Sequence, residues 1–142
     1  MQTFLPYPDF KQSAQVLDWK RLGKQRVEGM QLLKAITGEK KLDGNSYKGW
    51  VNHPATKMWS LYPDALKIYT NEMINEWIRR GYKNNMKLYK VPQTCIMPVW
   101  LGNVSLHASH RSNLLRKDFD YYSQYGWREQ NDLPYVWPGD IQ

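Results

Sequence analysis

Apolar residues recur every three or four positions in two long stretches of the chain, the spacing of one face of an α-helix. In the first stretch, Asp18 can cap a helix that runs to Ile36 or Thr37 and stops at Gly38. The second has Pro63 in its first turn and stops at Gly81. The apolar positions of the first stretch include Leu22, Val27, Met30, Leu33 and Ile36. Those of the second, Leu66, Tyr69, Met73 and Trp77, we expect to be buried in the core.

The remaining elements are shorter or less regular. Residues 1–8 carry two prolines and read as an extended arm, and Asp9 can cap a short helix that ends at Val16. Residues 38–54 read as a basic, glycine-containing loop, and Ser105 can cap a last helix that runs to about Tyr125. We therefore predict a mainly α fold, a compact bundle of three main helices with long loops that forms one domain over residues 1–142.

Two glycines interrupt the first long helix. Gly23 and Gly29 each cost about 1 kcal/mol relative to alanine in a helix interior. Their presence indicates that another helix or a ligand approaches the backbone closely at these positions.

The charge balance points to an anionic partner. The chain has 20 Lys and Arg against 13 Asp and Glu, a formal net charge of +7 and a sequence pI near 9.5. Such an excess favours nucleic acid, because binding phosphates releases condensed counterions, although many basic proteins are merely soluble. No apolar run is long enough to span a membrane, and one cysteine allows no internal disulfide. We expect a cytoplasmic monomer that does not contact membranes.

A polar string opens the first long helix between residues 20 and 28. Arg21, Gln25 and Glu28 share one face at spacings of four and three, and Lys20, Lys24 and Arg26 lie beside them. The string can place cations on phosphates, with Glu28 as an acid or base. It can also be a solvated face with internal ion pairs, and taken alone the pattern favours this second interpretation.

A second polar string occupies the last predicted helix, from His107 to Asp118. Helical spacing suggests an inward face of Ala108, Ser112, Leu115, Phe119 and Tyr122. It then places His110, Asn113, Lys117 and Tyr121 on an opposite polar face, which suits contacts to phosphates and bases. His107 and His110 also have a spacing found in metal sites, but few residues could complete the ligand set, so no metal is predicted.

The order of these pieces is informative. The segments Asp18–Lys24, Glu76–Tyr82, His107–Lys117 and Tyr121–Trp127 follow one another at spacings that resemble the pyrimidine-dimer DNA glycosylases of the endonuclease V type. The likeness covers most of the chain, although each motif by itself is short. The resemblance implies a small, all-helical, basic enzyme of base excision repair that acts on duplex DNA.

The chain departs from that family where the family's chemistry begins. The resemblance implies an N-terminal threonine amine that attacks the sugar C1′ and forms an imine, assisted by a glutamate. Here Met1 is followed by Gln2, whose bulk should hinder methionine removal, so Thr3 is not expected to be terminal. The register that matches the basic residues places Arg21 at the glutamate position. We therefore expect Glu28 or Asp18 to replace that carboxylate, without the amine-dependent lyase step.

Together these arguments predict a DNA N-glycosylase that excises a damaged or modified base and needs no cofactor. The predicted catalytic residues are Glu28, Arg21 and His110, and the predicted substrate-binding residues are Gln25, His107, Asn113 and Tyr121. The predicted nucleic-acid contacts are Lys20, Lys24, Arg26, Arg111, Arg116 and Lys117. Two alternatives stay open: a non-catalytic DNA- or RNA-binding module, and a hydrolase of free nucleosides or nucleotides.

Overall fold

The computed structural model describes residues 2–38 and 51–140. Within these ranges the chain forms α-helices and short 3₁₀ turns and no strand, which confirms the mainly α prediction. Most of the predicted basic loop, with Lys40, Lys41 and Lys48, lies outside the described residues. The described helices are α1 (Phe10–Val16), α2 (Trp19–Thr37), α4 (Pro54–Trp59), α5 (Pro63–Arg79), α6 (Val104–Lys117) and α7 (Phe119–Tyr122).

Local capping signals set the first two helices. The Asp9 side chain accepts a hydrogen bond from the Gln12 amide at the start of α1, and Asp18 accepts one from Arg21 at the start of α2. Gly38 ends α2 in the left-handed conformation, with φ of 75°. These boundaries agree with the predicted ones, whereas α4 was not predicted.

The last predicted helix is divided in the structure. Asn103 caps α6 instead of Ser105, through a hydrogen bond from the Leu106 amide to its side chain. The helix ends at Asp118, whose backbone leaves the helical region, and whose side chain caps the short α7 by accepting from the Tyr121 amide. The prediction of one helix to Tyr125 was therefore wrong, because a second cap interrupts it.

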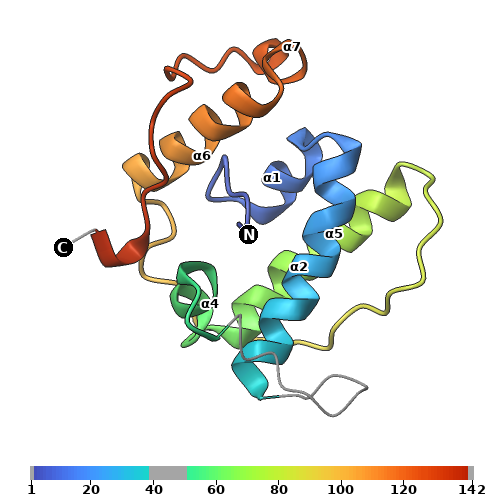
Figure 1. The fold of residues 1–142 in the computed structure, drawn as a ribbon. Helices are drawn as coiled ribbons and strands as arrows, with labels where there is room; N and C mark the ends of the chain where they lie inside the picture. The colour runs from blue at the N-terminus through green and yellow to red at the C-terminus, as the bar shows by residue number, and fades with distance from the viewer. Residues whose placement is uncertain (1, 39–50, 141–142) are drawn as a thin grey trace.

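The two glycines of α2 lie against α5 (Figure 1). A Cβ at Gly29 would stand 2.2 Å from the Thr70 hydroxyl oxygen, and one at Gly23 would stand 2.9 Å from the Trp77 ring. Both glycines therefore allow α5 to approach α2, one of the two causes that their presence suggested. The hydrophobic core next to this contact includes Trp59 and Tyr69, both fully buried.

The N-terminal arm runs through the middle of the molecule, between α6 on one side and α2 and α5 on the other (Figure 1). Residues 2–5 belong to no helix or strand and are buried, with Thr3 and Leu5 at 0% exposure. Their backbone groups have no neighbouring strand and pair with side chains of the surrounding helices instead. The arm is thus a central structural element and not a surface extension.

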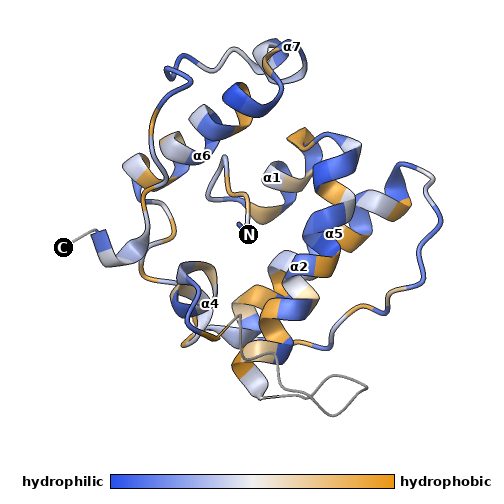
Figure 2. Ribbon diagram, viewed as in Figure 1, coloured by the Kyte–Doolittle hydropathy of each residue, from blue (hydrophilic) through white to orange (hydrophobic). Residues whose placement is uncertain are grey.

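The two halves of helix α2 differ in polarity. Its first half is mainly hydrophilic and its second half mainly hydrophobic (Figure 2). The second half contributes Leu32 and Leu33 to the core, and Gln25 of the first half forms hydrogen bonds with the N-terminal arm. Among the described residues, no helix combines the length and the apolar character that crossing a bilayer requires.

Candidate active site

A hollow of about 360 Å³ lies between the polar half of α2 and the end of α6. We call it the glutamate hollow, because Glu28 is its buried carboxylate. Cations from both helices line this hollow. Such an arrangement is expected if the two polar strings form one site. Its lining residues are Gln2, Phe4, Lys20, Arg21, Lys24, Gln25, Glu28, Lys117 and Tyr135.

Glu28 is held by one oxygen and faces a cation with the other. Its Oε2 accepts hydrogen bonds from the Gln25 side chain at 3.1 Å and from the Gln2 amide at 3.4 Å. Its Oε1 lies 3.7 Å from Nζ of Lys24, whose side chain is 74% exposed. The carboxylate is therefore fixed in direction by the protein, while its second oxygen faces a surface lysine.

Gln25 provides that orientation. Its Nε2 donates to Glu28 and to the Gln2 carbonyl, and its Oε1 accepts from the Phe4 amide and from the Tyr69 hydroxyl at 2.5 Å. Burial and the nearby charge of Glu28 raise the pKa of Tyr69 well above its ordinary value, so this hydroxyl remains a donor. The Gln25 amide is thus fully used inside the protein, which suits a positioning residue better than the predicted substrate contact.

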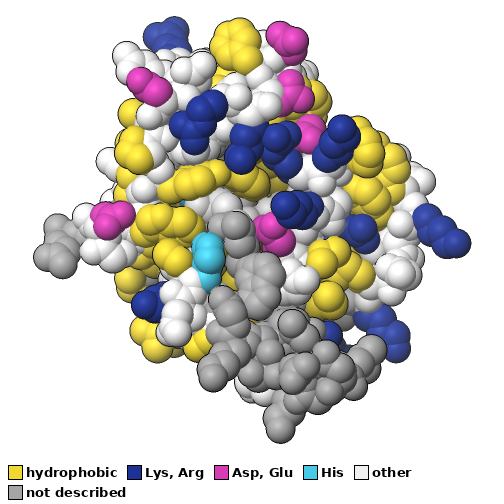
Figure 3. Space-filling view, viewed as in Figure 1, with side chains coloured by type: hydrophobic (Ala, Val, Ile, Leu, Met, Phe, Trp, Pro, Cys, Tyr) yellow, Lys and Arg dark blue, Asp and Glu magenta, His cyan; other side chains and the backbone are white. Residues whose placement is uncertain are grey.

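Positive charge gathers above the carboxylate. Figure 3 shows a band of Lys and Arg side chains across the face where α6 lies opposite α2. Burial and the charges of Arg21, Arg116 and Lys24 lower the pKa of Lys117, which Glu28 offsets only in part. A group of like charges this close together favours an added anion.

Arg21 has an internal partner as well. It forms an ion pair with Asp18 at 3.1 Å, and Asp18 also accepts a short hydrogen bond from the Tyr122 hydroxyl. Burial would raise the pKa of Asp18, but the hydrogen bonds from Tyr122 and Arg21 and the charge of Arg21 outweigh it, so that the pKa is lowered. Asp18 therefore remains an anion that fixes Arg21, and it is less available than Glu28 to act on a substrate.

A second hollow of about 410 Å³ adjoins the first. The two share Lys20, Arg21 and Lys117, which form a ridge between them. We call this space the tryptophan hollow. It is lined by Asp18, Trp19, Lys20, Arg21, Lys117, Asp118 and Tyr121, and it is where the structure places the predicted contact Tyr121.

Two of the four residues of the predicted polar face of α6, His110 and Asn113, are buried, which corrects the sequence interpretation. His107, His110 and Asn113 are at most 3% exposed and line neither hollow. Asn113 donates to the carbonyls of Ser109 and Leu133. These side chains face inward because the N-terminal arm and the C-terminal tail supply unpaired backbone groups that need polar partners.

The two histidines bind the arm from the α6 side. The Leu5 amide donates to Nδ1 of His110 at 2.8 Å, and the Leu5 carbonyl lies 2.8 Å from Nδ1 of His107. Burial, together with the charges of His107 and Arg111, lowers the pKa of His110 to about 3, so this ring is neutral. Its position inside the core argues against the predicted catalytic role.

Three of the predicted phosphate-binding arginines also have contacts elsewhere. Arg26 packs over the Trp77 ring, 4.2 Å from its centroid, and donates to Asn84. Arg111 donates to Glu129 and to the Pro6 carbonyl, and Arg116 donates to Asn113. Arg116 is exposed near Lys117, whereas Arg26 and Arg111 stabilise the fold.

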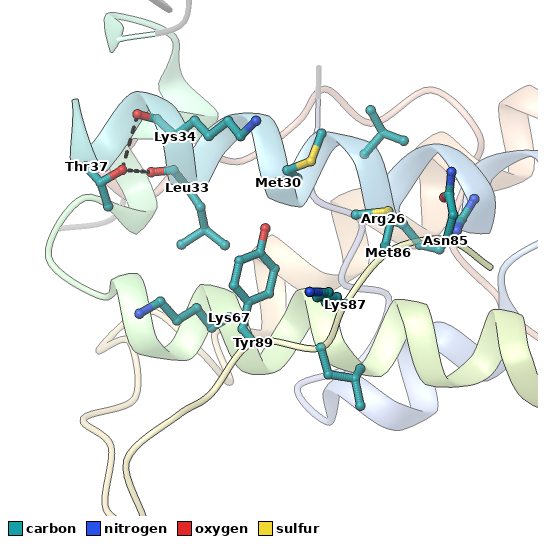
Figure 4. A pocket seen from close by; sticks show the side chains of 12 residues that line it. Arg26, Met30, Leu33, Lys34, Thr37, Lys67, Asn85, Met86, Lys87 and Tyr89 are labelled. Atoms are coloured by element: carbon teal, nitrogen blue, oxygen red, sulfur yellow. Dashed lines mark hydrogen bonds between the residues drawn. The ribbon is translucent and has the colours of Figure 1, made fainter. Parts of the chain in front are cut away.

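Arg26 lies at a different pocket, shown in Figure 4. This space of about 740 Å³ lies between α2 and α5 and the connector after α5. Its walls are largely apolar, with Met30, Leu33 and Leu88 among them. Its described lining residues include no carboxylate, so it has no counterpart of Glu28.

Three residues of the glutamate hollow were missed by the sequence interpretation. Gln2 and Phe4 come from the arm, and Tyr135 comes from the C-terminal tail. Nothing in the pattern of residues 1–8 indicated that the arm would be central. Within residues 2–38 and 51–140, no three His, Cys, Asp or Glu side chains come together as a metal site would require.

Comparison with known proteins fits this arrangement. Residues 1–90 match the family model of pyrimidine dimer DNA glycosylases. The chain belongs to this family. The match includes the arm and helices α1, α2, α4 and α5, while Lys117 and Tyr135 of the glutamate hollow lie beyond it. Neither the curated proteins nor the solved structures contain a match to the chain. Membership of this family carries a DNA glycosylase type of function and a DNA substrate.

Proposed function

We propose that this member of the pyrimidine dimer DNA glycosylase family is a DNA N-glycosylase that hydrolyses the bond between a damaged or modified base and its sugar. One observation carries the proposal: Glu28, 6% exposed, lies at a hollow whose rim carries Lys20, Arg21, Lys24 and Lys117. A fixed carboxylate surrounded by cations suits a sugar–phosphate chain, since the cations bind phosphates and the carboxylate acts on the sugar between them.

The reaction uses a water molecule and no cofactor. In the proposed step the water oxygen bonds to C1′, the C1′–N bond breaks, and the base leaves with its electron pair. Glu28 accepts the water proton and stabilises the positive charge that develops on the sugar, and the departing base is protonated from solvent. The target nucleotide has to leave the base stack to reach the hollow.

The backbone nitrogen of Gln2 lies where the amine of an imine-forming mechanism would be needed, next to Glu28. This nitrogen lies 3.4 Å from Oε2 of Glu28, but in the chain as written it is a peptide nitrogen, since Met1 precedes it. It can attack a sugar only as a free amine after Met1 is removed. Borohydride traps an imine and leaves a hydrolytic reaction without an adduct, so trapping by the purified, mass-verified chain would contradict the hydrolytic proposal.

The activity can be tested with duplexes that each carry one altered base, beginning with pyrimidine dimers because the family is named for them. Abasic sites are revealed by alkaline cleavage of the product. We expect abasic sites from at least one lesion and none from the undamaged duplex. A full panel without abasic sites would refute the glycosylase proposal.

A binding module without catalysis is the second candidate. The observation that favours it is the existing contact between Glu28 and Lys24, which already gives the carboxylate a counterion. Such a module would bind DNA with a strong salt dependence and produce no abasic sites. A hydrolase of free nucleotides would instead release bases from nucleotides and show no salt-sensitive duplex affinity.

A further inference from the structure

The tryptophan hollow stands beside the proposed reaction site and has no part in its chemistry. It contains Trp19, an aromatic side chain that is 54% exposed, whereas Tyr122, which is hydrogen-bonded to the preceding Asp18, is fully buried. An indole left in solvent at the first residue of a helix gains little stability from burial. Its ring is instead available as a surface on which another flat group can stack.

The cations between the two hollows indicate that the flat group is attached to an anion. Lys20, Arg21 and Lys117 line both spaces, so an anion on the ridge has one hollow on either side. In a nucleic acid, each phosphate has one nucleoside on its 5′ side and one on its 3′ side. Two adjoining hollows with cations between them thus match the order of base, phosphate and base in a dinucleotide step.

We propose that the tryptophan hollow binds a second nucleobase, next to the nucleotide that enters the glutamate hollow, by stacking it on Trp19. The phosphate between the two nucleotides lies on the ridge of Lys20, Arg21 and Lys117. This subsite rests on the proposed function for the identity of the first nucleotide. It gives the protein a grip on unstacked DNA that does not depend on which base is excised.

Lys20 has a different contact in the free protein and in the proposed complex. Its Nζ lies 5.6 Å from the centroid of the Trp19 ring, where it makes a cation–π contact. When a base stacks on the ring, Lys20 moves to the phosphate on the ridge. One cation thus covers the indole in the free protein and neutralises the backbone in the complex.

Binding to a duplex with one tetrahydrofuran abasic site and a neighbouring 2-aminopurine tests the subsite apart from catalysis. We expect Trp19→Ala to weaken binding about tenfold and to remove the fluorescence change of 2-aminopurine. Trp19→Phe should restore most of both signals, because a phenyl ring still stacks. The salt dependence should be unchanged in Trp19→Ala and should fall by about one phosphate contact in Lys20→Gln.

Phe119→Ala is the matched control. Phe119 is an aromatic residue of the neighbouring α7, 60% exposed, and it lines neither hollow. Its loss should leave the affinity and the 2-aminopurine signal as in the wild type. Equal binding by Trp19→Ala and the wild type, or an equal loss in Phe119→Ala, would overturn the subsite. Failure of the wild type to bind the duplex would instead count against the proposed function.

Discussion

The two polar strings of this chain look alike in sequence and have opposite roles in the structure. The string of α2 places Lys20, Arg21, Lys24 and Glu28 at the glutamate hollow. The string of α6 buries His107, His110 and Asn113 around the N-terminal arm and the tail, and only its end, Lys117, reaches the hollow. Polar composition alone therefore does not identify a site. The deciding factor is whether the protein's own backbone already uses those polar groups.

The comparison predicts that the α6 string matters mainly for stability. His110→Ala removes the acceptor of the Leu5 amide and leaves a small cavity, so we expect a loss of about 3 kcal/mol in the free energy of unfolding. Lys24→Ala on the exposed face of α2 should change stability by less than about 0.5 kcal/mol. Urea unfolding measures both. Similar stability in the two variants would show that His110 does not hold the arm.

The buried histidine also predicts a pH dependence of stability. The pKa of His110 is about 3 in the folded protein, below its ordinary value of 6.5, so the unfolded chain takes up the proton first. Stability should therefore fall as the pH drops from about 6.5 towards 3, by about 2 kcal/mol at pH 5. Unfolding experiments from pH 8 to pH 4 measure the change.

His110→Asn is the control for that titration. The asparagine side-chain oxygen can still accept from the Leu5 amide, but it does not titrate. The variant should lose most of the pH dependence that His110 contributes. If wild type and variant weaken equally on acidification, the pH dependence arises elsewhere, for example at His107, whose pKa is also lowered, mainly by burial.

The smallest predicted effect is a difference in DNA binding between variants of two cations of α6, Lys117 and Arg111. Lys117→Gln should weaken DNA binding a few-fold and reduce the slope of log affinity against log salt by about 0.9, the value of one phosphate contact. Arg111→Gln should leave the slope unchanged, because Arg111 is already paired with Glu129 and the Pro6 carbonyl. Salt titrations of folded variants by fluorescence anisotropy compare them. Equal slopes in the two variants would contradict the different roles given to Arg111 and Lys117.

Local signals explain how much of the fold the sequence predicts. Asp9, Asp18, Gly38 and Pro63 act within one helical turn, so the bounds of α1, α2 and the start of α5 can be read directly. The break at Asp118 was missed, since an aspartate that caps a new helix looks like any polar residue in a continuing one.

The site depends on contacts that no local pattern contains. The cations of α2 and the carboxylate of Glu28 could be predicted because they lie within three turns of one helix. The inward direction of His110 could not, because its partner Leu5 is 105 residues away in the chain. Gln2, Phe4 and Tyr135 could not be predicted either, because they too lie far in the sequence from the other residues of the hollow.

The central claim is that Glu28 performs the chemistry at a basic hollow, and single-turnover base excision by Glu28→Gln tests it most directly. Glutamine keeps the shape of the side chain but cannot accept the water proton. We predict that the excision rate falls by about 100-fold or more while DNA affinity and the unfolding midpoint remain close to wild type. Asp64→Asn, on the surface of α5, is the control and should excise normally. An excision rate in Glu28→Gln equal to the wild type would contradict the account.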